Sequence, residues 1–159
     1  MNIYHGGTES RREVGLLSEA LTESIIGSAI EVHRELGPGL LESVYQECLC
    51  QELRLREIPF LAQVELPINY KGVEIAGAYR IDLIVADEVV VELKSVERLL
   101  NVYEAQLLTY LKLTGKHVGL IIILMFPFCT GEFSGELYDP TIPLCFRVSA
   151  VDVFHATAQ

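Results

Sequence analysis

Apolar residues recur at helical spacing from Leu16 to Leu36, and Gly37-Pro38-Gly39 follows directly. A recurrence every three or four residues places apolar side chains on one face of a helix. Glycine is typical of helix ends, and proline is tolerated near helix starts. The pattern therefore predicts one helix over 16–36 and a second helix from Leu40 to about Arg56.

Beyond the second helix, the spacing of apolar residues changes from that of a helix to that of a strand. Apolar and polar side chains alternate over Phe60–Tyr70, as they do in a half-buried strand, and Val73–Val85 forms a second run of this kind. Proline cannot donate to a neighbouring strand, so Pro67 predicts an edge strand. Gly77 interrupts the second run and predicts a bulge or bend.

The next segment, Val89–Leu93, is short, apolar and β-branched, which is typical of a central strand. Helical periodicity returns over Leu99–Thr114 and ends at Gly115, and His117–Met125 predicts a further buried strand. This order of elements predicts an α/β domain of the α+β kind, with a mixed central sheet flanked by helices.

The length of 159 residues fits one domain, which we place at residues 16–125. Residues 1–15 are predicted to be a flexible leader, and residues 126–159 a divergent, irregular C-terminal tail. The first residues lack the apolar run of a secretory signal, and the apolar stretch at 118–128 is shorter than the ~20 residues of a membrane helix. We expect a cytoplasmic protein that does not cross a membrane.

Charged residues occur inside two of the apolar strands. Glu92 and Lys94 are two apart and share one face of their strand, and Asp82 lies within the preceding strand, among residues expected to be core. A hairpin of this length can bring Asp82 close to Glu92, where two carboxylates repel unless a cation lies between them. Oxygen ligands of this kind suit Mg²⁺ or Mn²⁺, although a surface ion pair is the ordinary alternative.

Four further residues are candidates with ordinary alternatives. Glu42 begins the second helix, where an acid also complements the helix dipole. Tyr45 follows one turn later and also suits the core. Gln106 and Tyr110 share a face of the third helix, where a polar pair within an apolar stripe needs some partner.

The chain resembles a known family. Gly39, Glu42 and Tyr45 have the spacing of the GxxExxY proteins, which are assigned to the PD-(D/E)XK nuclease superfamily. Asp82 followed by Glu92-Leu93-Lys94 is similar to the D-x(n)-E-x-K core of that superfamily, with Ile81 in place of the proline. The segment 106–110 is similar to the QxxxY motif of RecB-like nucleases. The resemblance runs from about residue 21 to residue 120.

The resemblance implies a restriction-endonuclease-like fold and metal-dependent hydrolysis of phosphodiester bonds in nucleic acid. It implies that Asp82 and Glu92, with Glu42, hold Mg²⁺ or Mn²⁺, and that Lys94 positions or activates the attacking water. The remaining motif residues would orient the substrate or the lysine: Gln106, Tyr110 and Tyr45.

The net charge of −10 opposes this interpretation, because proteins that bind nucleic acid usually carry a basic surface. A metal site itself contributes carboxylates, and a local basic patch does not show in a total. Two alternatives therefore remain open. One is an inactive binding or regulatory module with the same fold, either alone or as a homodimer. The other is a structural domain in which Asp82, Glu92 and Lys94 form an internal ion network.

Overall fold

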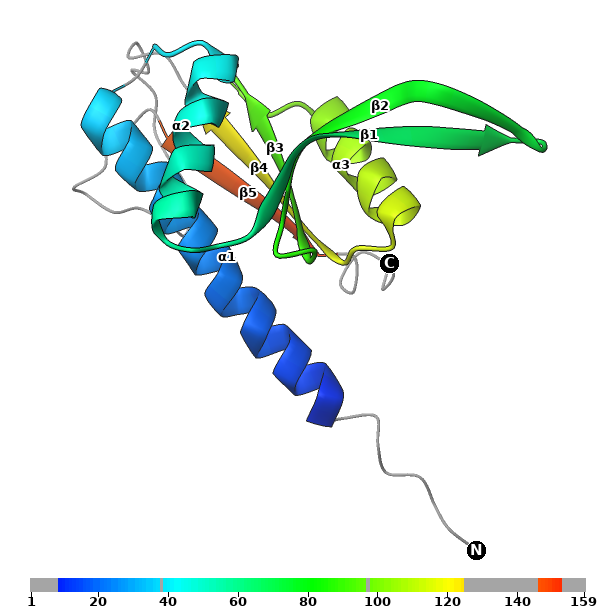
Figure 1. The fold of residues 1–159 in the computed structure, drawn as a ribbon, viewed down its shortest axis with the longest axis horizontal. Coiled ribbons are helices and arrows are strands. Elements are labelled where there is room, and N and C mark those ends of the chain that lie inside the picture. Colours follow the sequence, from blue (N-terminus) through cyan, green and yellow to red (C-terminus); the bar gives the residue numbers. More distant parts are fainter. Residues whose placement is uncertain (1–8, 38, 97, 125–145, 153–159) are drawn as a thin grey trace, which may run out of the picture.

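The computed structural model describes residues 9–37, 39–96, 98–124 and 146–152, without the side chains of residues 9–18, 146, 147, 151 and 152. Figure 1 shows its helices and strands. In chain order they are α1 (Glu9–Leu36), α2 (Glu42–Leu55), β1 (Phe60–Tyr70), β2 (Val73–Val85), β3 (Val89–Lys94), α3 (Asn101–Thr114), β4 (Val118–Leu124) and β5 (Phe146–Asp152).

The strands form one mixed sheet in the order β1-β2-β3-β4-β5. The pairs β1–β2, β2–β3 and β4–β5 are antiparallel, whereas β3 and β4 are parallel. Parallel neighbours need a crossover connection, and α3 provides it. The fold is α+β with a mixed central sheet and flanking helices, as the sequence predicted, and it is consistent with a restriction-endonuclease-like architecture.

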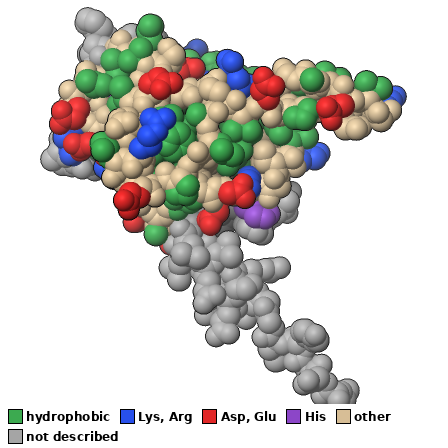
Figure 2. Space-filling view, in the orientation of Figure 1, with side chains coloured by type: hydrophobic (Ala, Val, Ile, Leu, Met, Phe, Trp, Pro, Cys, Tyr) green, Lys and Arg blue, Asp and Glu red, His purple; other side chains and the backbone are tan. Residues whose placement is uncertain are grey.

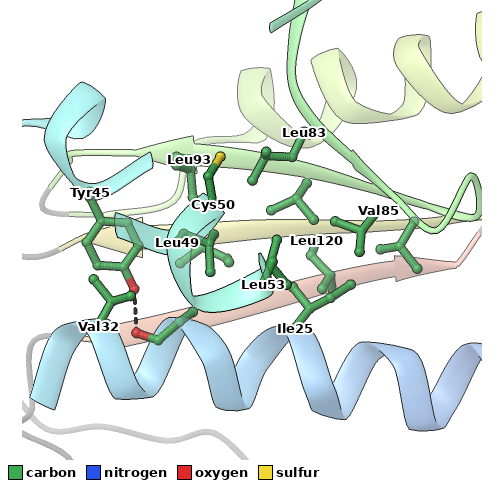
Figure 3. Close-up of a cluster of buried hydrophobic side chains, with 14 of the residues drawn as sticks. Ile25, Val32, Tyr45, Leu49, Cys50, Leu53, Leu83, Val85, Leu93 and Leu120 are labelled. Carbon is green, nitrogen blue, oxygen red and sulfur yellow. Dashed lines mark hydrogen bonds between the residues drawn. The ribbon is translucent and has the colours of Figure 1, made fainter. Parts of the chain in front are cut away.

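Each face of the sheet has its own apolar core. On one face, side chains of β2, β3 and β4, such as Leu83, Val91 and Leu120, pack against α1 and α2. Figure 3 shows this cluster, in which Leu49 and other residues of α2 lie between α1 and the sheet. On the other face, residues such as Val90 pack against α3. The sheet is therefore a buried layer between helices.

The strands β1 and β2 continue beyond the rest of the sheet as a two-stranded arm (Figure 1). Only Leu83–Val85 of β2 pairs with β3, whereas β1 and β2 pair along most of their length. The register of the arm shifts between Leu66 and Ile68, around Pro67 and opposite Gly77, whose φ is 64°. This confirms the predicted edge strand and the predicted bulge.

Several apolar side chains of the arm are exposed, including Tyr70, Val73 and Ile75. On the face seen in Figure 2, acidic and basic side chains are interspersed over the described part of the protein, arm included. Neither sign of charge dominates that face.

Two predictions need correction. The first helix begins at Glu9 rather than at Leu16, so residues 9–15, which were predicted to belong to a flexible leader, are helical. These residues are polar and lack the apolar periodicity by which a helix is recognised. Residues 1–8 lie outside the described part.

The predicted irregular tail also contains regular structure, because β5 pairs with β4 from Phe146 to Asp152. Its sequence is short and follows a long segment without a clear period, so the sequence alone did not reveal it. The remainder of the predicted tail, residues 126–145 and 153–159, lies outside the description. None of the helices among the described residues is long and apolar enough to cross a membrane.

Candidate active site

Asp82 lies where β2 separates from β3. The last paired residues of these strands are Leu83 and Val91. Two residues beyond Val91, the backbone N–H of Leu93 donates to Oδ2 of Asp82 at 2.9 Å. The carboxylate of Asp82 thus takes the place of a strand partner. This hydrogen bond fixes the position of Asp82 beside β3, at the point where the two strands no longer pair.

Glu92 and Lys94 project from β3 toward α3. They share the face of Val90, which packs against α3, and Lys94 Nζ donates to Glu92 Oε1 at 2.6 Å. The predicted common face of Glu92 and Lys94 is therefore confirmed. Lys94 is half-buried, and its Nζ lies 5.6 Å from the ring centroid of Tyr103 on α3, within the range of a cation–π contact.

The carboxylate of Glu92 is in an unfavourable environment. Only 3% of the residue is exposed, and its Oε2 is buried with no hydrogen-bond partner. Burial, together with the negative charges of Asp82 and Glu42, raises the pKa of Glu92 to about 7, although Lys94 opposes the shift. A buried oxygen without a donor is costly and calls for a partner such as a water or a cation.

The negative charges that disfavour the charged form of Glu92 favour the charged form of Lys94. Burial by itself lowers the pKa of this ammonium group, but the hydrogen bond to Glu92 and the negative charges around it outweigh burial. The pKa of Lys94 is therefore above its ordinary value. The lysine carries its positive charge at neutral pH, and it can offset negative charge but is poorly suited to accept a proton.

Glu42 approaches the end of β3 from the first turn of α2. Its Oε2 accepts a hydrogen bond of 2.9 Å from the backbone N–H of Ser95, and its charge contributes to the raised pKa of Glu92. The helix start and the strand end thus place Glu42 on the same side of the molecule as Asp82 and Glu92.

The candidate ligands fit a divalent cation in part. Within the described ranges, no three His, Cys, Asp or Glu side chains form a cluster that could hold a metal ion by themselves. Mg²⁺, however, is usually bound by one or two carboxylates, with water and substrate phosphate completing the shell. Asp82 and the unpartnered Oε2 of Glu92 match this mode of binding, with Glu42 as a more distant contributor.

Gln106 and Tyr110 lie on α3 and contact each other. Gln106 Nε2 donates to the Tyr110 hydroxyl at 2.6 Å. Tyr110 is buried and packs edge-on against Tyr79 of β2, with ring centroids 5.4 Å apart. Burial and the charge of Glu92 raise the pKa of Tyr110, so this hydroxyl is close enough to the carboxylates to sense them.

Tyr45 lies in the core rather than at the site. It is 1% exposed, and its hydroxyl donates to the backbone carbonyl of Ala29 on α1 at 2.6 Å (Figure 3). Burial also raises the pKa of the hydroxyl. These contacts favour the ordinary alternative for Tyr45, in which the side chain connects α2 to α1 in the core, while the orienting role stays a prediction.

Sequence reasoning missed three neighbours of the site. Gln46 on α2 and Gln63 on β1 contact each other and Asp82, and Tyr103 faces Lys94. A single glutamine on a helix or an edge strand carries no sequence signal. Gln46 follows Tyr45 directly and so could have been noticed as a polar residue near the motif, but its direction depends on how α2 packs.

Comparison with known proteins agrees with this geometry. A family model of the PD-(D/E)XK nuclease superfamily matches residues 19–130 of the chain. The chain belongs to the PD-(D/E)XK nuclease superfamily. For a PD-(D/E)XK chain, the family indicates nuclease-type hydrolysis of phosphodiester bonds.

Other comparisons add little to the PD-(D/E)XK assignment. A search of curated proteins finds no match. A solved structure described as "Crystal structure of SSO0001" is 19% identical, with a TM-score of 0.48, and the match covers 70% of this chain and 50% of that chain. The chain thus spans about half the length of that protein. A likeness of this degree carries no further argument.

Proposed function

We propose that the protein is a nuclease that hydrolyses phosphodiester bonds of nucleic acid with the help of Mg²⁺ or Mn²⁺. One observation supports this above the others: the buried Oε2 of Glu92 lacks a partner beside a second carboxylate, Asp82, and a charged lysine, Lys94. Buried polar atoms usually have a hydrogen-bond partner, so an unpartnered carboxylate oxygen beside a second carboxylate favours a cation site over a closed ion network.

Each side chain has a role that follows from its position. Asp82 and Glu92 would hold the metal, with Glu42 as a third carboxylate, and a bound divalent cation would lower the pKa of water and polarise the phosphoryl oxygen. Lys94 keeps its proton, so it orients the attacking water and offsets charge that develops on the phosphoryl group. Gln106 and Tyr110 orient the substrate or the lysine from α3.

The chain would belong, within the superfamily, to the GxxExxY proteins. Gly39, Glu42 and Tyr45 carry this motif. The contacts suggest two separate uses for it, because Glu42 accepts from Ser95 at the end of β3 whereas Tyr45 fastens α2 to α1. One turn of α2 thus links the core to the site.

The test is a cleavage assay with purified protein on single-stranded and double-stranded DNA and RNA, with Mg²⁺, with Mn²⁺ and with a chelator. We expect cleavage only when a metal is present, and its loss in Asp82→Ala and Lys94→Ala. Glu57→Gly serves as a control and should cleave normally, because Glu57 lies just past the end of α2 that is opposite to Glu42. Failure to cleave any of these substrates with either metal would contradict the proposal.

A second candidate is a binding or regulatory module that keeps the fold without turnover. The lack of a three-ligand cluster in the described part of the chain favours it. Such a module, alone or as a homodimer, would bind nucleic acid without cutting it. Gel-shift titrations beside the cleavage assay separate the two candidates, because only the nuclease converts the bound strand to shorter products.

A further inference from the structure

Gln63 has an unusual backbone conformation within a regular strand. Its φ is 52°, although neighbouring residues on both sides pair normally with β2: Ala62 with Leu83 and Val64 with Ile81. By this register Gln63 falls opposite Asp82. A left-handed conformation costs free energy for a residue with a side chain. Such a conformation persists within a strand only where surrounding contacts compensate for its cost, so we infer that contacts fix Gln63.

Two glutamine side chains meet at Asp82. Gln63 Nε2 donates to Gln46 Oε1 at 2.6 Å and also reaches Asp82 Oδ1 at 3.4 Å. Gln46 is buried on α2, and its own Nε2 donates to the backbone carbonyl of Asp82 at 3.4 Å. The two amides therefore connect α2 and β1 to both the main chain and the side chain of Asp82.

Each oxygen of the Asp82 carboxylate thus has a donor beside it, at 2.9 Å for Oδ2 and at the longer distance of 3.4 Å for Oδ1. The amide of Gln63 lies on Oδ1, and the N–H of Leu93 donates to Oδ2. Each carboxylate oxygen has two lone pairs, so one donor on each oxygen restrains rotation of the group and leaves lone pairs for a ligand. An amide does this without adding positive charge, which would compete with a bound cation.

We propose that Gln63, supported by Gln46, is a positioning residue that orients the Asp82 carboxylate for the divalent cation. This inference rests on the proposed function, because it assigns the cation to Asp82. A residue that hydrogen-bonds to a metal-binding side chain, without contacting the metal, typically contributes a factor of about 10 to 100 to metal affinity. Loss of the Gln63 amide should weaken Mn²⁺ binding by a factor in this range.

The test titrates Mn²⁺ into the wild-type protein and into Gln63→Gly, follows bound metal by the loss of the electron paramagnetic resonance signal of free Mn²⁺, and fits a half-saturating concentration to each. Glycine tolerates a positive φ, so weaker binding in this variant reports the lost amide and not a strained strand. Gln63→Asn is the second variant, because asparagine also tolerates this conformation but is one methylene shorter. We expect half-saturation at a Mn²⁺ concentration about tenfold higher or more in both variants.

Glu57→Gly is the matched control. Glu57 also has a left-handed φ, 57°, but it lies just past the end of α2, away from Glu42. This variant should keep the wild-type half-saturation. If Gln63→Gly and Gln63→Asn bind Mn²⁺ as the wild type does, the positioning role is wrong while the nuclease proposal stands. If the wild-type protein itself shows no response to Mn²⁺, the metal site and the inference are both wrong.

Discussion

At the scale of single residues, the folded state places the carboxylate of Glu92 in an unfavourable environment. Its carboxylate is buried between Asp82 and Lys94, one oxygen has no partner, and its pKa rises from 4.5 to about 7. A carboxyl group with a raised pKa binds its proton more tightly in the folded than in the unfolded chain. Stability is therefore lost as pH rises from about 4.5 to about 7, and the loss is complete above this range.

Glu92→Gln should remove this loss. Without metal, we expect the variant to be more stable than the wild type by about 1 to 3 kcal/mol at pH 8, because each unit of pKa shift corresponds to about 1.4 kcal/mol. The difference should shrink toward zero near pH 4.5, the ordinary pKa of a glutamate. Urea unfolding in a chelator at several pH values measures it. A variant that is less stable than the wild type at pH 8 would show that Glu92 is satisfied in the fold.

Tyr45 provides a contrasting test at the same scale. Tyr45→Phe removes only the hydroxyl that donates to Ala29, so we expect a loss of about 1 kcal/mol in the free energy of unfolding. Cleavage and Mn²⁺ affinity should stay at wild-type values, because the ring remains in the core. Loss of cleavage at unchanged stability would instead support the orienting role for this tyrosine.

At the scale of elements, the site depends on how α3 packs against the sheet. Gly119 of β4 lies under Leu107 of α3, and a Cβ at this position would come within 2.8 Å of the Leu107 side chain. Leu107 is fully buried and has little room to move. The glycine therefore allows α3 to lie close enough to β4 to bring Gln106 and Tyr110 to the site.

Gly119→Ala should destabilise the protein by about 1 to 3 kcal/mol, the usual cost of overpacking a core. Leu107→Val provides space for the added methyl group, so the double variant should be more stable than the sum of the two single changes predicts. Thermal or urea unfolding of the four proteins measures this coupling. Additive effects would mean that the two residues do not press on each other.

The sequence predicted most elements because their boundaries have local causes. The bounds of β1 and β2 follow from the turn at Lys71-Gly72, where both residues have positive φ, and from the change of period after Pro59. The start of α1 and the existence of β5 were missed because neither has an apolar period or a turn signal that marks it. The local pattern was sufficient to predict the bounds of an element where a turn signal or a change in the spacing of apolar residues marks its end.

The site was predicted in part for a related reason. The spacing of Glu92 and Lys94 on one strand gave their common face, and the hairpin brought Asp82 beside them. The contacts of Gln46 and Gln63 with Asp82 could not be predicted, because they depend on the register of β1, the packing of α2 and a positive φ at Gln63. These are properties of the assembled sheet and not of any one segment.

At the scale of the whole molecule, the sheet, α2 and α3 converge on the end of β3. The core between α1, α2 and the sheet fixes the start of α2, while the opposite core fixes α3. The arm of β1 and β2 begins beside Asp82, where β2 leaves β3, and it extends away from the body (Figure 1). Three carboxylates and Lys94 therefore lie where the sheet, α2 and α3 meet. This grouping is the basis of the proposed activity.

The presence of a cation at this junction is tested most directly by anomalous diffraction from crystals soaked in Mn²⁺. We predict an anomalous peak between the carboxylates of Asp82 and Glu92, and its absence from crystals of Asp82→Asn grown and soaked in the same way. Wild-type crystals without a peak at these carboxylates, under conditions that label a known Mn²⁺ protein, would contradict the account.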